Sequence, residues 1–130
     1  MIVDSSAIVA LLRKEAGFER LKEALLRAEP PVAMASPNYV EASIVIDAKG
    51  SAEGSRTLDD LIAEYEIEVI PFTAEHARLA REAYRDFGRG SGHPAKLNFG
   101  DAMAYAVAKA ERQSLLFVGN DFIHTDIDPA

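Results

Sequence analysis

The 130-residue chain is 48% hydrophobic and 27% charged, which is the balance of one globular domain with a single core. The sequence contains no cysteine, which excludes disulfides, zinc–thiolate sites and thiol nucleophiles, so any metal must be held by oxygen or histidine. The formal net charge of −7 argues against a general nucleic-acid coat, because phosphate binding depends on Lys and Arg.

Apolar stretches in the sequence are short. The longest, 102–108 and 115–118, fall well below the roughly 18 to 20 residues that cross a bilayer. The segment from Met1 to Asp4 lacks the basic and apolar regions of a signal peptide. We therefore expect residues 1–130 to form one domain of a soluble cytoplasmic protein without a membrane partner.

The first half of the chain predicts two strands and three helices. The apolar run 1–3 predicts a strand, and residues 4–6 can cap a helix that runs to about Glu15. A second amphipathic helix begins at Gly17 and ends before the prolines at 30 and 31. Its predicted inner face consists of Phe18, Leu21, Leu25 and Leu26. Residues 32–35 predict a buried strand, and Ser36 is the expected N-cap of a helix that has Pro37 at its first position and Gly50 beyond its end.

The second half of the chain continues the alternation. We expect a helix at about 56–65, a strand at 67–70, and a helix capped by Thr73 that runs to Phe87, with Gly88 just beyond it. A glycine-containing surface loop at 88–92 precedes a helix from Asn98 or Phe99 to about residue 112 and a fourth strand at 115–118. Residues 126–128 are too short to assign. The alternation predicts a single-domain α/β/α sandwich with a mostly parallel central sheet of four to five strands.

Carboxylates lie where a parallel sheet gathers its ligands, outside the carboxyl ends of the strands. Asp4 follows the first strand directly, although it can equally serve as a helix N-cap. Asp101 lies near the start of a helix rich in alanine, where an aspartate can also stabilise the helix dipole. The alanines at 102, 104, 106, 108 and 110 are expected to allow close helix packing.

Glu41 is unusual because its helix neighbours Ile44, Val45 and Ala48 are apolar. A carboxylate on an apolar stripe calls for a cation or a water-filled cleft, since burying an unpaired charge costs several kcal/mol. The alternative is an ion pair with a nearby Arg or Lys.

The fourth predicted strand is followed by Asn120 and Asp121, which offer oxygen ligands at the same sheet edge but are also common turn residues. Asp126 and Asp128 are expected to be solvated tail residues. Several acids without a neighbouring lysine or arginine suggest a site for a hard divalent cation, and Mg²⁺ or Mn²⁺ fits.

Four segments in order resemble the motifs of VapC-type PIN-domain toxins. They are Met1–Ala7 (MIVDSSA), Ser36–Ala42 (SPNYVEA), Leu97–Ala106 (LNFGDAMAYA) and Leu116–Phe122 (LFVGNDF). The resemblance covers the whole chain. It implies a compact α/β/α nuclease fold in which Asp4, Glu41 and Asp101 surround Mg²⁺, with Asp121 as a fourth acid. One departure is that many relatives have an acid where this chain has Asn120, which leaves open whether Asn120 or Asp121 faces the metal.

The resemblance also implies an activity. Asp4 and Asp101 would coordinate the ion, Ser6 would support the site, and Glu41 would position the attacking water. The expected reaction is metal-dependent hydrolysis of an RNA phosphodiester bond to a 5′-phosphate and a 3′-hydroxyl, as in an endoribonuclease toxin of a toxin–antitoxin pair. A VapB-like antitoxin that inserts an arginine into the acidic cleft, and a homodimer, are the implied partners.

RNA contacts must come from outside the acidic site. Residues 78–96 hold five basic residues and two acids, so an acidic protein can still carry a local basic patch. The candidates for phosphate contact are Arg85, Arg89, His93 and Lys96, with Arg13 and Lys14 as a second pair; each can also be a plain surface residue.

Three other functions compete with this interpretation. A PIN-fold nuclease that acts on DNA would have the same acids, and a PIN-fold protein that binds without cutting would not need them. A receiver-like signalling domain would require an acidic pair after the first strand, where this chain has Asp4-Ser5, and would not place Asp101 within a helix.

Overall fold

Four short strands alternate with six helices in residues 1–48 and 52–130, the part of the chain that this computed structural model describes. The strands are β1 (Ile2–Val3), β2 (Ala33–Ala35), β3 (Glu68–Ile70) and β4 (Leu115–Leu116). The helices are α1 (Ser5–Arg13), α2 (Phe18–Arg27), α3 (Ser36–Asp47), α4 (Ala52–Glu64), α5 (Ala74–Phe87) and α6 (Phe99–Glu111). Each strand and helix predicted from the sequence is present.

The strands form one parallel sheet in the order β3-β2-β1-β4. Ile2 pairs with Ala33 on one side and with Leu115 on the other, so β1 lies in the interior of the sheet. An isolated parallel bridge joins Leu115 to Pro129 and brings the C-terminal tail beside β4. The sequence predicted four to five strands, and residues 126–128 were too short to assign. In the structure this region forms no fifth strand among the described residues, only the single bridge at Pro129.

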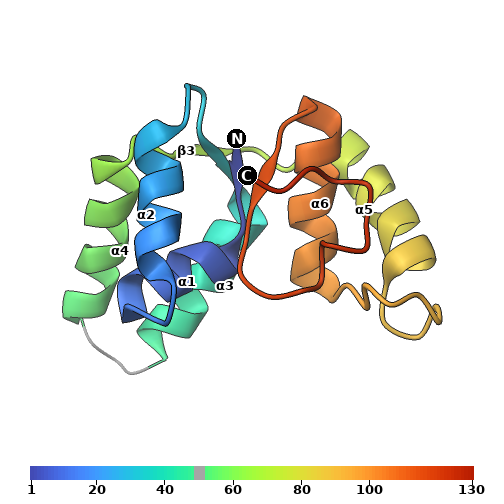
Figure 1. The fold of residues 1–130 in the computed structure, drawn as a ribbon, viewed down its shortest axis with the longest axis horizontal. Helices are drawn as coiled ribbons and strands as arrows, with labels where there is room; N and C mark the ends of the chain where they lie inside the picture. Colours follow the sequence, from blue (N-terminus) through green and yellow to red (C-terminus); the bar gives the residue numbers. More distant parts are fainter. Residues whose placement is uncertain (49–51) are drawn as a thin grey trace.

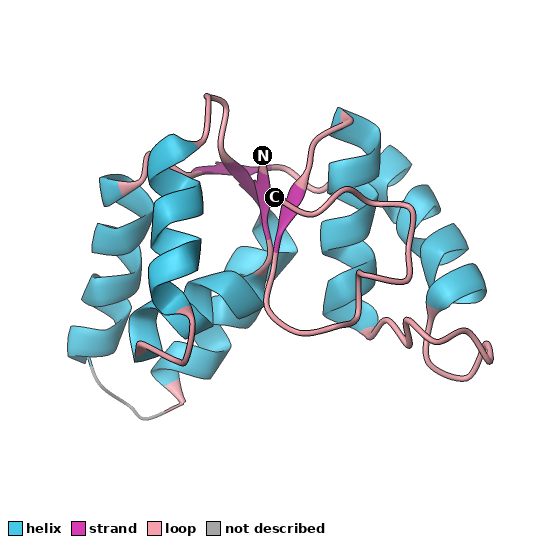
Figure 2. Ribbon diagram, in the orientation of Figure 1, coloured by secondary structure: helices cyan, strands magenta, loops and turns pink. Residues whose placement is uncertain are grey.

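Helices cover both faces of the sheet, as Figures 1 and 2 show, with α1 to α4 on one side and α5 and α6 on the other. The reason is the two-residue alternation of side chains along a strand. Val3, Met34 and Leu116 join the core beneath α1 to α4. Their neighbours in the same strands, among them Ile2 and Leu115, join the core beneath α5 and α6. The predicted α/β/α sandwich is confirmed.

Helix α6 packs closely against α5 because its side chains are small. Four of its five predicted packing alanines, at positions 102, 104, 106 and 108, are buried, and Ala110 is half-buried. Thr73 caps α5 as expected, and its hydroxyl accepts a hydrogen bond from the backbone N–H of His76. No helix in the described residues is both long enough and apolar enough to cross a membrane.

Two helix ends differ from the sequence expectation. Ser36 was the expected N-cap of α3, but Ala35 has that position and Ser36 is already helical. The predicted end of α3, at Gly50, lies outside the described residues. Gly88 ends α5 with an ordinary φ of −74°, so a left-handed turn does not explain the glycine. Space does, because a Cβ at this position would collide with the carbonyl oxygen of Tyr84.

The predicted inner face of α2 is partly wrong, and the apolar stripe of α3 lies largely outside the core. Leu26 on α2 is 68% exposed, and Ile44 on α3 is 65% exposed. In α3 the residues that face the interior are Asn38 and Ala42, so the helix is rotated away from the orientation that its apolar stripe predicts. The stripe instead lines an open apolar groove of about 490 Å³ with Phe99 and Met103 of α6.

Candidate active site

Asp4 leaves the end of β1 and is held from three directions. Its carboxylate oxygen Oδ2 accepts hydrogen bonds from the backbone N–H of Ser6 at 3.0 Å and from the Ser6 hydroxyl at 2.5 Å. Its other oxygen, Oδ1, accepts a bond of 3.3 Å from the side-chain amide of Asn38. Asp4 is therefore the N-cap of α1 and also a buried carboxylate with a fixed orientation, so the two interpretations of the sequence are compatible.

Glu41 lies half-buried on α3 beside Asp4. The Ser5 hydroxyl donates a 2.7 Å hydrogen bond to Glu41 Oε2, and the Asn38 amide nitrogen lies 3.5 Å from the same oxygen. Within the described residues Glu41 forms no ion pair with Lys or Arg, so the alternative explanation of this acid by charge pairing finds no partner there.

Asp101 is held in a capping box at the start of α6. Its Oδ2 accepts a 2.7 Å bond from the backbone N–H of Asn98, and Asn98 Oδ1 accepts a 2.9 Å bond from the backbone N–H of Asp101. The reciprocal bonds fix the carboxylate against the helix start.

The charges of the four predicted acids act on one another. Burial, and to a smaller extent the negative charges of Asp4, Asp121 and Glu41, raise the pKa of Asp101 to about 6, against the lowering effect of the bond from Asn98. Burial also raises the pKa of Asp4, with a smaller contribution from the charge of Glu41, although the bonds from Ser6 oppose it. The fold thus brings acids from four separate segments into one negative field.

The segment that carries Asn120 and Asp121 is tied to the body of the molecule at both ends. At its start, the backbone N–H of Val118 donates to the Ser6 hydroxyl at 3.0 Å. Asn120 is exposed, whereas Asp121 is half-buried and contributes to the field at Asp101. Of these two residues, Asp121 is therefore the one that acts on the other acids of the site.

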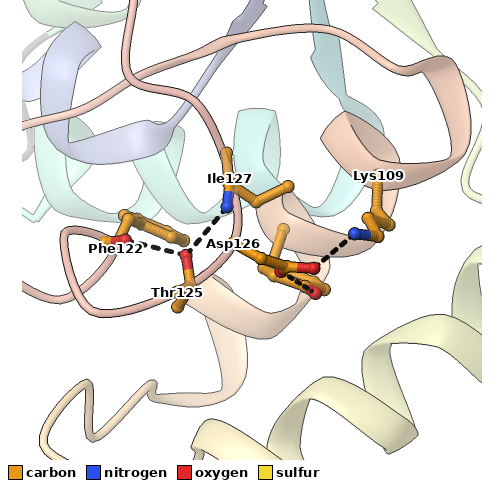
Figure 3. A network of polar contacts seen from close by, with 6 residues as sticks. Lys109, Phe122, Thr125, Asp126 and Ile127 are labelled. Atoms are coloured by element: carbon orange, nitrogen blue, oxygen red, sulfur yellow. Dashed lines mark hydrogen bonds and ion pairs between the residues drawn. The ribbon is translucent and has the colours of Figure 1, made fainter.

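A polar network on α6 anchors the far end of this segment (Figure 3). The Tyr105 hydroxyl donates a 2.6 Å bond to Asp126, and Lys109 forms an ion pair with the same carboxylate. The Thr125 hydroxyl donates to the carbonyl oxygen of Phe122 at 2.7 Å. Asp126 is exposed, as expected of a solvated tail residue, but its contacts with Tyr105 and Lys109 also secure the tail to α6.

Three residues of the site were not identified from the sequence. Ser5 orients Glu41, and Asn38 reaches both Asp4 and Glu41. Gly100 lies against Glu41 so closely that a Cβ would collide with both carboxylate oxygens. A glycine in the first turn of an otherwise alanine-rich helix is a signal that could have indicated this close approach, since glycine is a poor helix former.

The donor set can be tested against a hard divalent cation. In the described residues no three acidic or histidine side chains form a ready metal cage. The charges of Asp4, Glu41 and Asp121 nevertheless all act on Asp101. In addition, Asn38 Oδ1 is buried without a hydrogen-bond partner in the described part of the chain. Mg²⁺ commonly uses one or two carboxylates and keeps several waters, so an open set of carboxylate oxygens fits it.

Four of the predicted phosphate contacts, Arg13, Arg85, Arg89 and Lys96, lie on the surface. Arg85 pairs with its neighbour Asp86, and Arg13 donates to the carbonyl oxygen of Val45 at 3.2 Å. Arg89 and Lys96 are exposed around the glycine loop. Within the described residues none of the four forms an ion pair with the acidic cluster.

The chain is similar to known proteins along almost its entire length. The sequence model of the PIN domain matches residues 1–128. The chain is 52% identical over 130 residues to "Ribonuclease VapC42" of Mycobacterium tuberculosis, covering 100% of this chain and 98% of that protein. It is 50% identical over 130 residues to "Ribonuclease VapC28" of the same species, covering 100% of this chain and 97% of that protein.

Solved structures share the fold at low sequence identity. Mycobacterium tuberculosis VapC20, described as a sarcin-ricin loop cleaving toxin, aligns with a TM-score of 0.73 at 18% identity over 98% of both chains. VapBC2 from Rickettsia felis, bound to a DNA fragment from its promoter, gives 0.72 at 15% identity over 99% of this chain and 96% of that one. The near-complete match to the domain model and the half-identical VapC relatives show that this chain belongs to the PIN-domain family, among its VapC proteins.

Proposed function

We propose that this protein is a metal-dependent endoribonuclease toxin that hydrolyses RNA phosphodiester bonds at the acidic cluster of Asp4, Glu41, Asp101 and Asp121. The observation that carries the proposal is the shared negative field of these four acids, which come from separate strand ends and helix starts. The ribonuclease names of relatives that are 52% and 50% identical support RNA as the substrate.

Asp4 and Asp101 would hold a divalent cation, with Mg²⁺ preferred and Mn²⁺ as the alternative. When bound, the cation supplies positive charge that offsets the phosphate and makes a water molecule more acidic. Glu41, which Ser5 orients, would accept a proton from the attacking water. Attack on phosphorus and cleavage of its bond to the 3′ oxygen would leave a 5′-phosphate and a 3′-hydroxyl. Ser6 and Asn98 hold the carboxylates of Asp4 and Asp101 in place during this step.

A VapB-like antitoxin is the proposed inhibitor. The negative cluster suits an inserted arginine, because a guanidinium can replace the cation with paired hydrogen bonds to carboxylates. A chain of the toxin–antitoxin complex from Klebsiella pneumoniae, and a chain of VapBC2 from Rickettsia felis, share the fold of this protein.

A second copy of the chain is the proposed occupant of the apolar groove between α3 and α6. Val40, Ile44 and Phe99 are 52%, 65% and 75% exposed and contribute to one continuous apolar surface. Exposed apolar surface of this kind marks protein–protein contacts. Because Glu41 also lines the groove, a dimer formed here would place its two acidic sites beside the contact.

The test is cleavage of a panel of structured RNAs by purified, antitoxin-free protein with Mg²⁺, Mn²⁺ or EDTA. The Asp4→Asn and Asp101→Asn variants are the active-site changes, and Asp60→Asn, an exposed acid on α4, is the matched control. We expect metal-dependent cutting that is lost in both active-site variants and kept in the control. A folded wild type that cuts none of the RNAs would refute the proposal, and parallel reactions with single-stranded DNA would test the DNA-cutting alternative.

A further inference from the structure

Asn38 has an unusual position for a side chain with no assigned role. It lies in the first turn of α3 and is only 1% exposed. Its amide nitrogen lies 3.1 Å from the carbonyl oxygen of Gly100, 3.3 Å from Asp4 Oδ1 and 3.5 Å from Glu41 Oε2. Three acceptors around one atom identify that atom as the nitrogen, because the amide oxygen could not donate to any of them.

The orientation that lets the Asn38 amide nitrogen donate leaves the amide oxygen without a donor. Asn38 Oδ1 is buried and has no hydrogen-bond partner in the described part of the chain. Native structures contain few such groups, and each calls for an explanation. Here both N–H groups are directed to oxygens of the acidic site, and the acceptor is left unpaired.

Asn38 is also the side chain that joins two of the acids. Of these two acids, the Ser6 hydroxyl bonds to Asp4 and not to Glu41, and the Ser5 hydroxyl bonds to Glu41 and not to Asp4. Among the hydrogen bonds of the described residues, those of Asn38 alone connect both carboxylates, and they also reach the backbone of α6 next to Asp101. Two like charges in a partly buried site repel each other, and an N–H group between them reduces that repulsion.

We propose that Asn38 is a positioning residue that fixes the separation and orientation of the Asp4 and Glu41 carboxylates for a divalent cation. The inference depends on the proposed function, because it assumes that these acids hold the ion. Asn38 itself contacts neither RNA nor the reacting phosphate. It acts through Asp4 and Glu41, as groups behind metal ligands do when they orient those ligands.

The test measures Mn²⁺ binding directly, by electron paramagnetic resonance titration of the full-length protein, in parallel with RNA cleavage. Asn38→Ala removes the bonds, and Asn38→Ser keeps one donor if the alanine variant does not fold. Ala42→Gly weakens α3 one turn away from Asn38 without removing a hydrogen bond to the acids, and Ser43→Ala removes a bond from a side chain to its own helix. These two controls separate positioning from general loss of stability.

We expect Asn38→Ala to weaken Mn²⁺ binding by about 10-fold or more, the usual effect of losing a group that orients a metal ligand. The kcat should fall while the KM for RNA stays within about twofold, because a buried residue does not contact the RNA. Asn38→Ser should lie between Asn38→Ala and wild type, and both controls should bind Mn²⁺ as the wild type does.

Three outcomes would overturn the inference: unchanged Mn²⁺ binding in Asn38→Ala, an equal loss in Ala42→Gly, or a wild type that binds no Mn²⁺. A protein that binds Mn²⁺ in the expected order of affinity but cuts no RNA would contradict the proposed function and leave the role of Asn38 supported.

Discussion

Replacing Asp101 by asparagine should abolish cutting and at the same time stabilise the metal-free protein. Asn has the same shape as Asp, and its side-chain oxygen can still accept the bond from the Asn98 backbone, so the cap of α6 is kept. What is removed is a buried negative charge in the field of three other acids. If the variant is more stable but inactive, the negative charge of Asp101 lowers the stability of the folded protein while it serves the reaction.

The size of the effect follows from the pKa of Asp101, which burial and its acidic neighbours raise from 3.8 to about 6. A rise of this size corresponds to about 3 kcal/mol, which we reduce to about 2 kcal/mol because water in the cleft screens the charge. Between pH 4 and pH 6 the folded protein binds this proton more tightly than the unfolded chain does. Stability therefore falls as the pH rises through this window and stays lower above it.

At pH 7.5 in EDTA, Asp101→Asn should thus unfold at a temperature about 8 °C above wild type, and the difference should shrink as the pH approaches 4. Thermal melts and urea midpoints across this range measure it, with Asp60→Asn as the control for a surface charge. Adding Mn²⁺ should stabilise the wild type more than the variant. A variant no more stable than wild type at pH 7.5, or a difference that does not depend on pH, would refute the reasoning.

Three further substitutions test other parts of the structure. Gly100→Ala places a methyl group against the Glu41 carboxylate, so we expect at least a tenfold loss of RNA cutting with an unchanged circular dichroism spectrum; near-normal cutting would contradict the close approach. Ile44→Glu should convert the proposed dimer to a monomer in light scattering while changing the free energy of unfolding by less than about 0.5 kcal/mol, and a variant that remains dimeric would exclude this surface as the contact. Tyr105→Phe removes the bond to Asp126 and should lower the unfolding free energy by about 1 kcal/mol in urea, whereas no change would show that this bond does not anchor the tail.

The fold could be predicted because its signals are local. Asp4, Thr73 and Asn98 each cap a helix that begins after a strand or loop, and the capping bond is formed within a few residues of the cap itself. Alternating strands and helices then leave few topologies for a parallel sheet. The prediction was wrong at Leu26, which is exposed although it follows the apolar pattern of α2. The apolar stripe of α3 shows why such a pattern is ambiguous, because its residue Ile44 lines an exposed groove.

The acids of the site could be identified, but the groups that hold them could not. An aspartate directly after a strand, or a glutamate on an apolar stripe, can be identified from the sequence because a charged residue is unexpected among apolar neighbours. Asn38 carries no charge, and its role depends on contacts with Asp4, 34 positions away, and with Gly100, 62 positions away. Such contacts exist only once β1, α3 and α6 have met, so no spacing along the chain encodes them.

Two of these acids also form local bonds that offset part of the stability cost expected from their burial. Asp4 caps α1, and Asp101 forms half of the capping box whose N-cap is Asn98; a cap can be worth about 1 kcal/mol. That local gain offsets part of the cost of gathering like charges in a buried site, and it fixes each carboxylate before any cation arrives. Glu41 has no capping role, and it is the acid that depends on Ser5 and Asn38 for its position. Substitutions of those two neighbours should therefore disturb Glu41 first and leave the caps of α1 and α6 intact.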